Sequence, residues 1–352
     1  MVELVGNERH IKEIEDEIHK TPYNKATQKH IGMLKAKLAK LKASSGQKGG
    51  GGLGYAVRKQ GDATVILVGF PSVGKSTLLN RLTNAESKVA AYEFTTLTVI
   101  PGMLELNGAR IQVLDVPGLI EYAASGKGRG REVLSVLRSA DLLIIIVSGQ
   151  ESEKQKRIIE DELYQAGFRL NQQPPDVKVL RKSSGGVRIE MARNSQLSQE
   201  TVREILSEFR VLNADVVIRE NLSIDQLVDC LARNRVYVPV LFVANKADLF
   251  SFSGDYLKIS AMKNEGVQDL KELIWKKLEM KRIFLKKPGK PPDMVEPLII
   301  RGPVKVHDIC LQLNLLKHFR FAKIWGPSSR FPGQKVGLEQ KLADRDIVEV
   351  HN

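Results

Sequence analysis

Runs of consecutive apolar residues predict a set of buried strands in the middle of the chain. The runs are 63–70 (ATVILVGF), 111–116 (IQVLDV), 141–148 (DLLIIIVS), 238–245 (VPVLFVAN) and the shorter 256–260 (YLKIS). Stretches with helical patterning separate them, at 131–139, 151–165 and 267–278. Strands that alternate with helices predict an α/β fold with a mainly parallel sheet, in which ligands bind at the carboxyl ends of the strands.

The first fifty residues follow helical spacing instead. Ile11, Ile14 and Ile18 predict one helix, and a second carries an apolar stripe of Ile31, Leu34, Leu38 and Leu41. Thr21 is the expected N-cap of the second helix, with Pro22 in its first turn. The opposite face of this helix is rich in lysine. The hairpin can therefore pack on the main domain, contact RNA, or do both.

The interval between the strands at 141–148 and 238–245 is too long for one βαβ step. Within it, 177–191 (VKVLRKSSGGVRIEM) contains two strand-like runs around a Ser-Ser-Gly-Gly turn, which predict a β-hairpin. A helix follows, with Ser198 as its expected N-cap. We expect a small α+β subdomain inserted into the main domain.

Two segments rich in Gly, Pro or Ser divide the chain. The first is 44–54 (SSGQKGGGGLG), and the second is 286–297 (KKPGKPPDMVEP). Beyond the second, strands and turns surround one helix, as in a compact sheet-with-helix module. The predicted domains are an N-terminal basic helical region with its glycine-rich linker (1–60), a main domain (61–167 and 236–287), the insertion (168–235) and a C-terminal module (291–352).

Charge narrows the classes of partner. The 352 residues carry a net charge of +13, and ten basic residues but no acidic one lie between positions 18 and 60. A second basic cluster lies at 276–290. Such uneven charge favours RNA or ribosome contact over general solubility, although no DNA specificity is evident. The longest apolar run has six residues, 142–147, too short for a bilayer. The two cysteines, far apart, fit a reducing cytoplasm.

A phosphate-binding loop follows the first buried strand. The segment 69–76 (GFPSVGKS) has the pattern Gly-x-x-x-x-Gly-Lys-Ser and leads into a helix. Its backbone N–H groups and the helix dipole favour anions. Lys75 is expected to contact the β- and γ-phosphates, and Ser76 to bind Mg²⁺. The expected nucleotide contacts of this loop are Gly69, Pro71, Ser72, Val73, Gly74, Lys75, Ser76 and Thr77.

A second motif, Asp115-Val-Pro-Gly118, ends the next buried strand. Asp115 is expected to hold Mg²⁺, through water, and the Gly118 N–H to contact the γ-phosphate. Between the two motifs, a threonine of 92–102 (YEFTTLTVIPG) should reach both Mg²⁺ and the γ-phosphate. Thr96 is preferred, Thr95 competes, and Thr98 is a third candidate. The expected catalytic residues are Lys75, Thr96 and Gly118, and the expected metal ligands are Ser76, Thr96 and Asp115.

A third motif, Asn245-Lys246-Ala247-Asp248, identifies the base. An Asp248 carboxylate can accept from N1–H and the 2-amino group of guanine, donors that adenine does not present in that arrangement. Lys246 can lie along the base, and Asn245 can link this loop to the phosphate loop. Ser260 and Ala261 follow a short strand, and the Ala261 N–H is expected to meet guanine O6. Met262 stands where lysine is usual, which predicts weaker packing over the base.

The order of these motifs, with "FTTL", "LDVPGLIEYAASGKGRGREVL" and the basic N-terminal region, resembles the Obg superfamily of GTPases, and within it the DRG (developmentally regulated GTP-binding protein) family. The C-terminal residues from "PLIIRGPVKVHDICLQLN" onward resemble a TGS domain, a ubiquitin-like β-grasp module. The resemblance implies a Ras-like P-loop NTPase fold with GTP or GDP as ligand. It also implies translation-associated work, ribosome binding and, in eukaryotes, a stabilising regulatory partner protein.

Hydrolysis is expected to be slow without help. Ras-like enzymes place a glutamine after the DxxG motif to orient the attacking water, and here that position is Leu119. Some relatives hold K⁺ beside the phosphates through an asparagine of the loop, where this chain has Ser72. K⁺ therefore stays open as a cofactor, and a partner, a monovalent cation or the ribosome is expected to stimulate turnover.

Two alternatives to a GTPase switch stay open. One is a ribosome- or RNA-binding protein that keeps GTP as a structural ligand with negligible turnover. The other is an Obg-related ATPase, which the intact Asn245–Asp248 motif disfavours. In the C-terminal module, RNA contact and a merely solvated charged surface are both open. The basic candidates there are Lys305, His307, Lys317, His318, Arg320 and Lys323.

Overall fold

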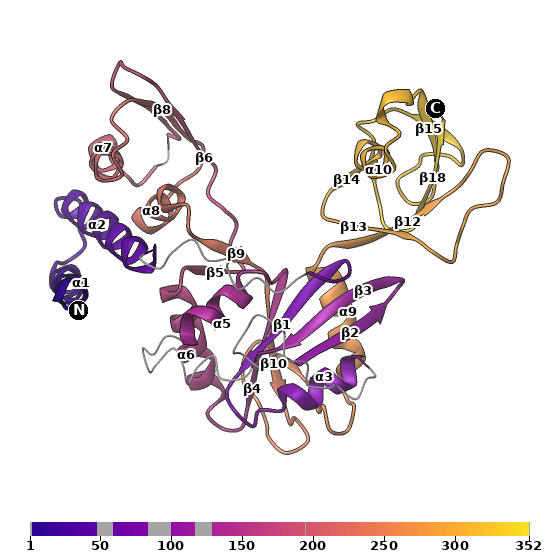
Figure 1. The fold of residues 1–352 in the computed structure, drawn as a ribbon, viewed down its shortest axis with the longest axis horizontal. Coiled ribbons are helices and arrows are strands. Elements are labelled where there is room, and N and C mark those ends of the chain that lie inside the picture. The colour runs from indigo at the N-terminus through magenta and orange to yellow at the C-terminus, as the bar shows by residue number, and fades with distance from the viewer. Residues whose placement is uncertain (1, 48–58, 84–99, 117–128, 194, 352) are drawn as a thin grey trace. The chain divides into compact units, whose positions relative to one another are not determined.

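A computed structural model describes residues 2–47, 59–83, 100–116, 129–193 and 195–351 (Figure 1). The chain divides into two compact units, which are described separately. One comprises Met1–Leu53 with Gly167–Tyr237, and the other Gly54–Ala166 with Val238–Asn352. Among the described helices, none is long and apolar enough to cross a membrane.

The larger unit contains a six-stranded sheet in the order β11-β10-β4-β1-β3-β2. All neighbouring strands are parallel except the edge pair β2–β3. The strands are β1 Ala63–Gly69, β2 Ile100–Leu106, β3 Ala109–Asp115, β4 Leu142–Ser148, β10 Val240–Asn245 and β11 Leu257–Lys258. The mainly parallel α/β sheet predicted from the apolar runs is confirmed.

Helices cover both faces of this sheet. On one face, α3 (Lys75–Thr83) and α9 (Val267–Lys277) share a core with alternate residues of β1, β3 and β4, including Leu78, Leu270 and Ile144. The other side carries α5 (Arg129–Leu137) and α6 (Ser152–Gln165) (Figure 1). Because both faces are buried, β1 has no exposed position. The sheet is thus a rigid base for the loops at its carboxyl edge.

The C-terminal module of the same unit contains a five-stranded sheet in the order β13-β12-β18-β15-β16. The helix α10 (Val306–Gln312) packs in its core, and a short 3₁₀ helix, Leu316–His318, follows α10 along the chain. Its strands are β12 Met280–Leu285, β13 Leu298–Arg301, β15 Phe321–Trp325, β16 Gln334–Val336 and β18 Asp346–His351, with β14 Val304–Lys305 and β17 Lys341–Leu342 paired separately. The core includes Ile283, Ile309 and Ile324.

The start of this module differs from the sequence expectation. The segment 286–297 was expected to be a linker in front of a module that begins at 291. Instead β12 lies inside the module's sheet, parallel to β18 and antiparallel to β13, so 286–297 is a connection within it. The cause is that β12 follows α9 almost directly. Its apolar residues Ile283 and Leu285 pack in the core of the C-terminal module rather than in the core of the six-stranded sheet.

In the smaller unit, the N-terminal hairpin packs on the inserted segment. The helices α1 (Val2–Lys20) and α2 (Gln28–Gln47) contact each other, and α2 also contacts α7 (Gln199–Glu208) and α8 (Ile224–Ala232). Ile31 and Ala36 of α2 share a core with Ile205 of α7 and Leu227 of α8. Ser198 caps α7 as expected, since its side chain accepts from the Thr201 N–H.

Two local expectations for this unit were wrong. The strands β6 (Val177–Arg181) and β7 (Val187–Met191) do not form a hairpin, because β8 (Ala214–Ile218) lies between them, antiparallel to β6 and parallel to β7. The strands β5 (Phe168–Leu170) and β9 (Val236–Val238) pair separately. Thr21 does not cap α2, which begins at Gln28. The Asn24 side chain accepts from the N–H groups of Ala26 and Thr27 instead.

Candidate functional site

The motif residues meet at the carboxyl edge of the larger sheet. Gly69 is the last residue of β1, Asp115 the last of β3 and Asn245 the last of β10. The parallel register aligns Leu67 with Asp115 and Gly69 with Ile146. Segments separated by up to about 180 residues therefore converge on one edge, the usual ligand-binding position of such sheets.

The phosphate loop is too tight for side chains at its two glycines. A Cβ at Gly69 would lie 2.5 Å from the Ile146 carbonyl oxygen, and one at Gly74 would lie 2.3 Å from Asn245 Nδ2. Gly74 has φ +96°, a conformation that glycine adopts without steric cost. Ser72 is also left-handed, at φ +62°. The loop is therefore a strained, backbone-lined turn in front of α3.

Lys75 crosses this turn. Its Nζ donates to the carbonyl oxygens of Gly69, at 3.0 Å, and Phe70, at 2.9 Å, and the residue is only 8% exposed. Lys75 is also the first residue of α3, so the helix start, whose first N–H groups have no acceptor within the helix, follows the loop directly. One fixed cation and a helix N-terminus together favour a phosphate chain at this place.

A pair of oxygen donors lies next to the loop. Ser76 Oγ donates to Asp115 Oδ2 at 2.6 Å, and Asp115 is 2% exposed. Its second oxygen, Oδ1, is buried and receives no hydrogen bond from any residue that the structure describes. A buried carboxylate oxygen without a donor is costly unless it has a further ligand. Ser76 and Asp115 thus fit Mg²⁺, a cation that prefers carboxylate and hydroxyl oxygens.

Asn245 connects three of the motif loops. Its Nδ2 donates to the Val73 carbonyl oxygen at 2.8 Å, the link to the phosphate loop expected from the sequence. Its Oδ1 accepts from the Ala261 N–H at 3.0 Å. Lys246 adds a second link, from Nζ to the Ser72 carbonyl oxygen at 2.8 Å. Asn245 is 2% exposed, so its own two bonds are shielded from water, whereas the Lys246 bond is exposed.

Asp248 is held as a charged acceptor. A hydrogen bond with Ser260 is the main reason that the pKa of Asp248 lies below its usual value, and the Lys263 ammonium, 3.7 Å from Oδ2, adds to the shift. The Ala261 N–H, expected to face guanine O6, donates to Asn245 in this structure. Met262 is 74% exposed beside it. An ionised carboxylate and a loop of backbone amides thus lie together, as a guanine site requires.

The other expected site residues divide into two groups. Pro71 and Thr77 are exposed on the phosphate loop and the first turn of α3, while Val73 is buried. Gly118, Leu119 and the three candidate threonines Thr95, Thr96 and Thr98 lie outside the described residues.

Some residues that support this edge carry no motif signal. Arg81, in the last turn of α3, donates to the carbonyl oxygens of Ala261 and Met262. Gln155 of α6 bonds both the N–H and the carbonyl of Ser148, the residue aligned with Asn245. These side chains bond main-chain groups, which every residue type has. Such contacts therefore cannot be predicted from the identity of the partner residue. The sequence offered only a basic residue at a helix end.

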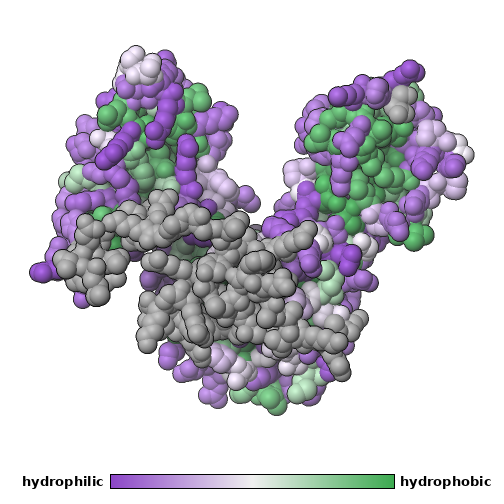
Figure 2. Space-filling view, in the orientation of Figure 1, coloured by the Kyte–Doolittle hydropathy of each residue, from purple (hydrophilic) through white to green (hydrophobic). Residues whose placement is uncertain are grey.

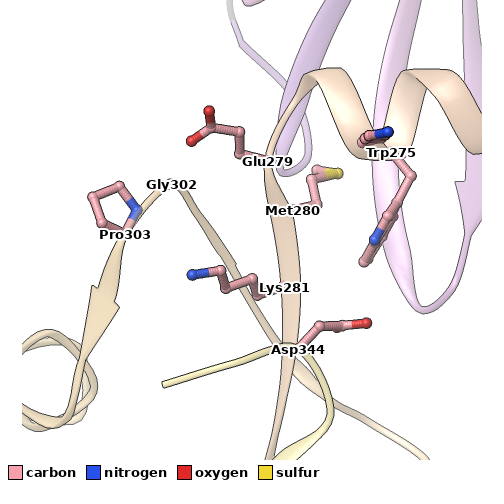
Figure 3. Close-up of a pocket in the computed structure, with 8 residues that line it drawn as sticks. Trp275, Glu279, Met280, Lys281, Gly302, Pro303 and Asp344 are labelled. Carbon is pink, nitrogen blue, oxygen red and sulfur yellow. The ribbon is translucent and has the colours of Figure 1, made fainter. Parts of the chain in front are cut away.

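A cavity of about 640 Å³ lies elsewhere, where α9 passes into β12 (Figure 3). None of the motif residues that the structure describes lines it. Its lining residues are Trp275, Lys276, Glu279, Met280, Lys281, Gly302, Pro303 and Asp344.

Family models cover the chain from the first strand to the end. Residues 64–182 match the model described as a 50S ribosome-binding GTPase, and 184–280 match the model for the C-terminal region of that domain. Residues 281–352 match the TGS domain, in agreement with the start of the module at β12.

Relatives match over nearly the whole length. An uncharacterized GTP-binding protein of Methanocaldococcus jannaschii is 50% identical over 366 residues, which cover 99% of this chain and 93% of the relative. Developmentally-regulated GTP-binding protein 1 of Xenopus laevis is 42% identical, with 99% of each chain covered. Its homolog in Dictyostelium discoideum is 43% identical, with 97% and 98% covered.

The solved structure of the cytosolic domain of FeoB from L. pneumophila has a TM-score of 0.36 at 16% identity and covers 61% of this chain and 64% of that chain, values too low to support an argument. The relatives and the family models show which family the chain belongs to. The chain belongs to the developmentally regulated GTP-binding protein (DRG) family, GTP-binding proteins with a P-loop GTPase domain followed by a TGS domain.

Proposed function

We propose that this chain is a Mg²⁺-dependent GTPase with slow intrinsic hydrolysis that acts as a ribosome-associated switch in translation. The observation that carries the nucleotide part is the linkage through Asn245, which joins the phosphate loop at Val73 to the base loop at Ala261. A nucleotide that fills both loops is then read at its phosphates by Lys75 and at its base by Asp248.

Ser76 and Asp115 are the described residues that would hold Mg²⁺, with Thr96 as the proposed third ligand from the segment outside the described residues. A bound Mg²⁺ would neutralise negative charge on the phosphates. Lys75 binds the same phosphates, and the Gly118 N–H is the proposed γ-phosphate contact. The chain has Leu119 in place of a water-orienting glutamine, which supports slow turnover and stimulation by a partner protein, the ribosome or K⁺.

A contact with ribosomal RNA is supported by charge and by the surface of the TGS domain. On β15, Phe321, Lys323 and Trp325 point away from the core that holds Ala322 and Ile324. Register places His351 opposite Phe321 and Lys335 opposite Lys323 on the same face. Lys335 is exposed and the other four residues of this face are partly exposed. Aromatic rings with lysines on a sheet face are typical of single-strand RNA surfaces.

The pairing of the aromatic and basic groups sharpens this assignment. The rings of Phe321 and His351 stack with their centroids 4.3 Å apart, and Lys335 Nζ lies 4.1 Å from the centroid of the Phe321 ring. The acidic residue of this face, Glu349, is paired with Lys286 and His351. We therefore name Phe321, Lys323, Trp325, Lys335 and His351 the TGS sheet face. Two of the earlier candidates, Lys305 and His307, have acidic partners in Glu339 and Asp308.

The lysines of α2 give weaker support. Lys29, Lys35 and Lys40 pair with Glu204, Asp225 and Glu208 of the inserted segment. Their charge is therefore partly neutralised within the unit, and packing accounts for much of this face. Lys37 remains exposed.

Single-turnover phosphate release tests the proposal against a structural role for GTP. The chain loaded with GTP and Mg²⁺ should release phosphate slowly alone and faster with ribosomes. Asp115→Asn should bind GTP without the gain in affinity that Mg²⁺ gives the parent chain. Release that is absent under both conditions would leave GTP as a structural ligand, and fast release in sodium buffer without a partner would contradict the slow-switch assignment.

A further inference from the structure

Arg81 holds two successive carbonyl groups of the base loop. Its Nε donates to the Ala261 carbonyl oxygen at 3.1 Å and its Nη2 to the Met262 carbonyl oxygen at 3.0 Å. The guanidinium group is planar, with its donors in a fixed fork, so two bonds from one side chain restrict the rotation of the peptide groups between them. Ala261 is 1% exposed and Met262 74%, so the fork lies where this loop leaves the core.

The helix that carries Arg81 also begins the phosphate site. Lys75 is the first residue of α3 and Arg81 lies six positions later, about 9 Å along the axis. Leu78, Leu79 and Leu82 fix the helix in the core together with Val267 of α9. A side chain at the far end of α3 therefore positions the base loop relative to the same rigid element that binds the phosphates.

Asn245 and Arg81 bond to opposite sides of the same residue. The Ala261 N–H donates to Asn245 Oδ1, while the Ala261 carbonyl oxygen accepts from Arg81. The direction of the amide groups in this loop is thus set by two side chains from β10 and α3. Guanine O6 needs an N–H in a defined direction, because hydrogen bonds weaken steeply when the donor is misaligned.

We propose that Arg81 is a positioning residue for guanine recognition, which fixes the Ala261–Met262 peptide group so that the Met262 N–H, next to the Ala261 N–H that donates to Asn245, meets O6 of the base. This rests on the proposed function, in which the loop at Ser260–Met262 reads guanine. Arg81 does not touch the nucleotide. Its loss leaves two carbonyl groups that water can reach and a loop whose amides point in several directions.

The test compares nucleotides as well as variants. Equilibrium binding of GDP, 6-thio-GDP and IDP is measured on the full chain, on Arg81→Ala and on Arg81→Lys. Sulfur at position 6 is a poor acceptor, so the GDP to 6-thio-GDP ratio reports the O6 contact. Inosine lacks the 2-amino group, so the GDP to IDP ratio reports Asp248. Lys258→Ala, an exposed cation on the neighbouring strand β11, is the matched control.

Arg81→Ala should weaken GDP binding about tenfold, equivalent to about 1.4 kcal/mol. The preference for GDP over 6-thio-GDP, measured as the ratio of their affinities, should fall. The ratio of the affinities for GDP and IDP should stay the same. Arg81→Lys, which can keep one bond, should give an intermediate ratio, and Lys258→Ala should match the parent. If Arg81→Ala weakens all three nucleotides equally, the role is structural and the proposal fails. A parent chain that does not prefer GDP to ADP would instead overturn the proposed function itself.

Discussion

At the scale of single residues, the site depends on side chains with more than one partner. Asn245 joins the phosphate loop, its own strand and the base loop through two hydrogen bonds. Asp248 interacts with Ser260 and Lys263, which keeps its carboxylate ionised, as the proposed contact with the donors of guanine requires. Specificity for the base therefore needs a charged oxygen that is already partly paired, so that it stays charged when water is excluded.

Asp248→Asn tests the base assignment. An amide oxygen accepts, but its NH₂ group opposes the 2-amino group of guanine and suits the 2-oxo group of xanthine. We expect GDP binding to weaken at least about a hundredfold, since an unmatched buried donor costs about 1–3 kcal/mol at each contact, while XDP binding improves. Competition titrations with both nucleotides measure this. Unchanged GDP affinity would remove guanine as the ligand.

Asp141 gives a prediction for pH. Burial raises the pKa of this carboxyl, but bonds from Arg301, the Thr64 N–H and Lys59 outweigh it, so the pKa lies below the ordinary value of 3.8. A lowered pKa adds stability that is present above pH 3.8 and lost as the pH falls through the lower folded-state pKa.

Asp141→Asn should therefore reduce the free energy of unfolding by about 1–3 kcal/mol at pH 7. The difference between variant and parent should begin to shrink as the pH falls below about 4, since Asp141 then takes up a proton in the unfolded chain, and it should vanish only below the lower folded-state pKa. Denaturant titrations at pH 7, 5 and 3.5 measure it. A difference that stays constant down to pH 3.5, or grows, would show that Asp141 acts by shape and not by charge.

At the scale of elements, the sequence predicted the parallel sheet and the motif loops but not how the smaller elements pair. Apolar runs fix the sheet strands because both of their faces must be buried. For β6 and β7 the turn residues suggested a hairpin, yet β8 lies between the two strands. The Asn213 side chain, directly before β8, accepts from the Gly186 N–H of the turn. Turn residues do not predict which distant strand pairs with their neighbours.

The packing of α2 shows the same limit. Its apolar stripe was predicted, but Ala36 and Ala39 are buried as well, and a Cβ at Gly32 would lie 3.1 Å from Ile205 Cδ1. Small residues let two elements approach, and only the partner shows that they are needed. Arg81 was missed for a related reason, since its partners are main-chain oxygens.

The strand β12 allows a test of the module boundary. It lies between β13 and β18, buries Ile283 completely and pairs Arg282 with Asp344 at 2.6 Å. A fragment of residues 279–352 should unfold cooperatively, whereas 291–352 should lack stable structure, because it loses an interior strand and its hydrogen bonds on both sides. Circular dichroism melts of both fragments decide it. Cooperative unfolding of 291–352 would restore the boundary expected from the Pro-rich segment.

At the scale of the whole molecule, hydrophilic and hydrophobic residues occur in both units on the face that Figure 2 shows. Net charge alone does not locate a partner. The excess of +13 over the chain attracts any polyanion. What distinguishes one surface is the arrangement of its cations, because lysines that are paired with acids release few counterions on binding. The TGS sheet face keeps Lys323 and Lys335 beside aromatic rings, whereas three lysines of α2 face acidic residues.

Lys323→Glu with Lys335→Glu tests this surface in the intact chain. Ribosome affinity, measured by co-sedimentation with GDP and with a non-hydrolysable GTP analogue, should drop at least about tenfold. The slope of log affinity against log salt concentration should become shallower by about 0.7 per lysine. A matched variant, Arg157→Glu with Lys258→Glu, changes the net charge equally on exposed positions of the GTPase domain and should bind as the parent does. Equal losses in both variants would mean that total charge, and not the TGS sheet face, drives the association.

Phosphate release measured on the same samples then separates docking from catalysis. A docking defect should remove the stimulation by ribosomes and leave the slow intrinsic rate unchanged, because neither lysine belongs to the nucleotide site.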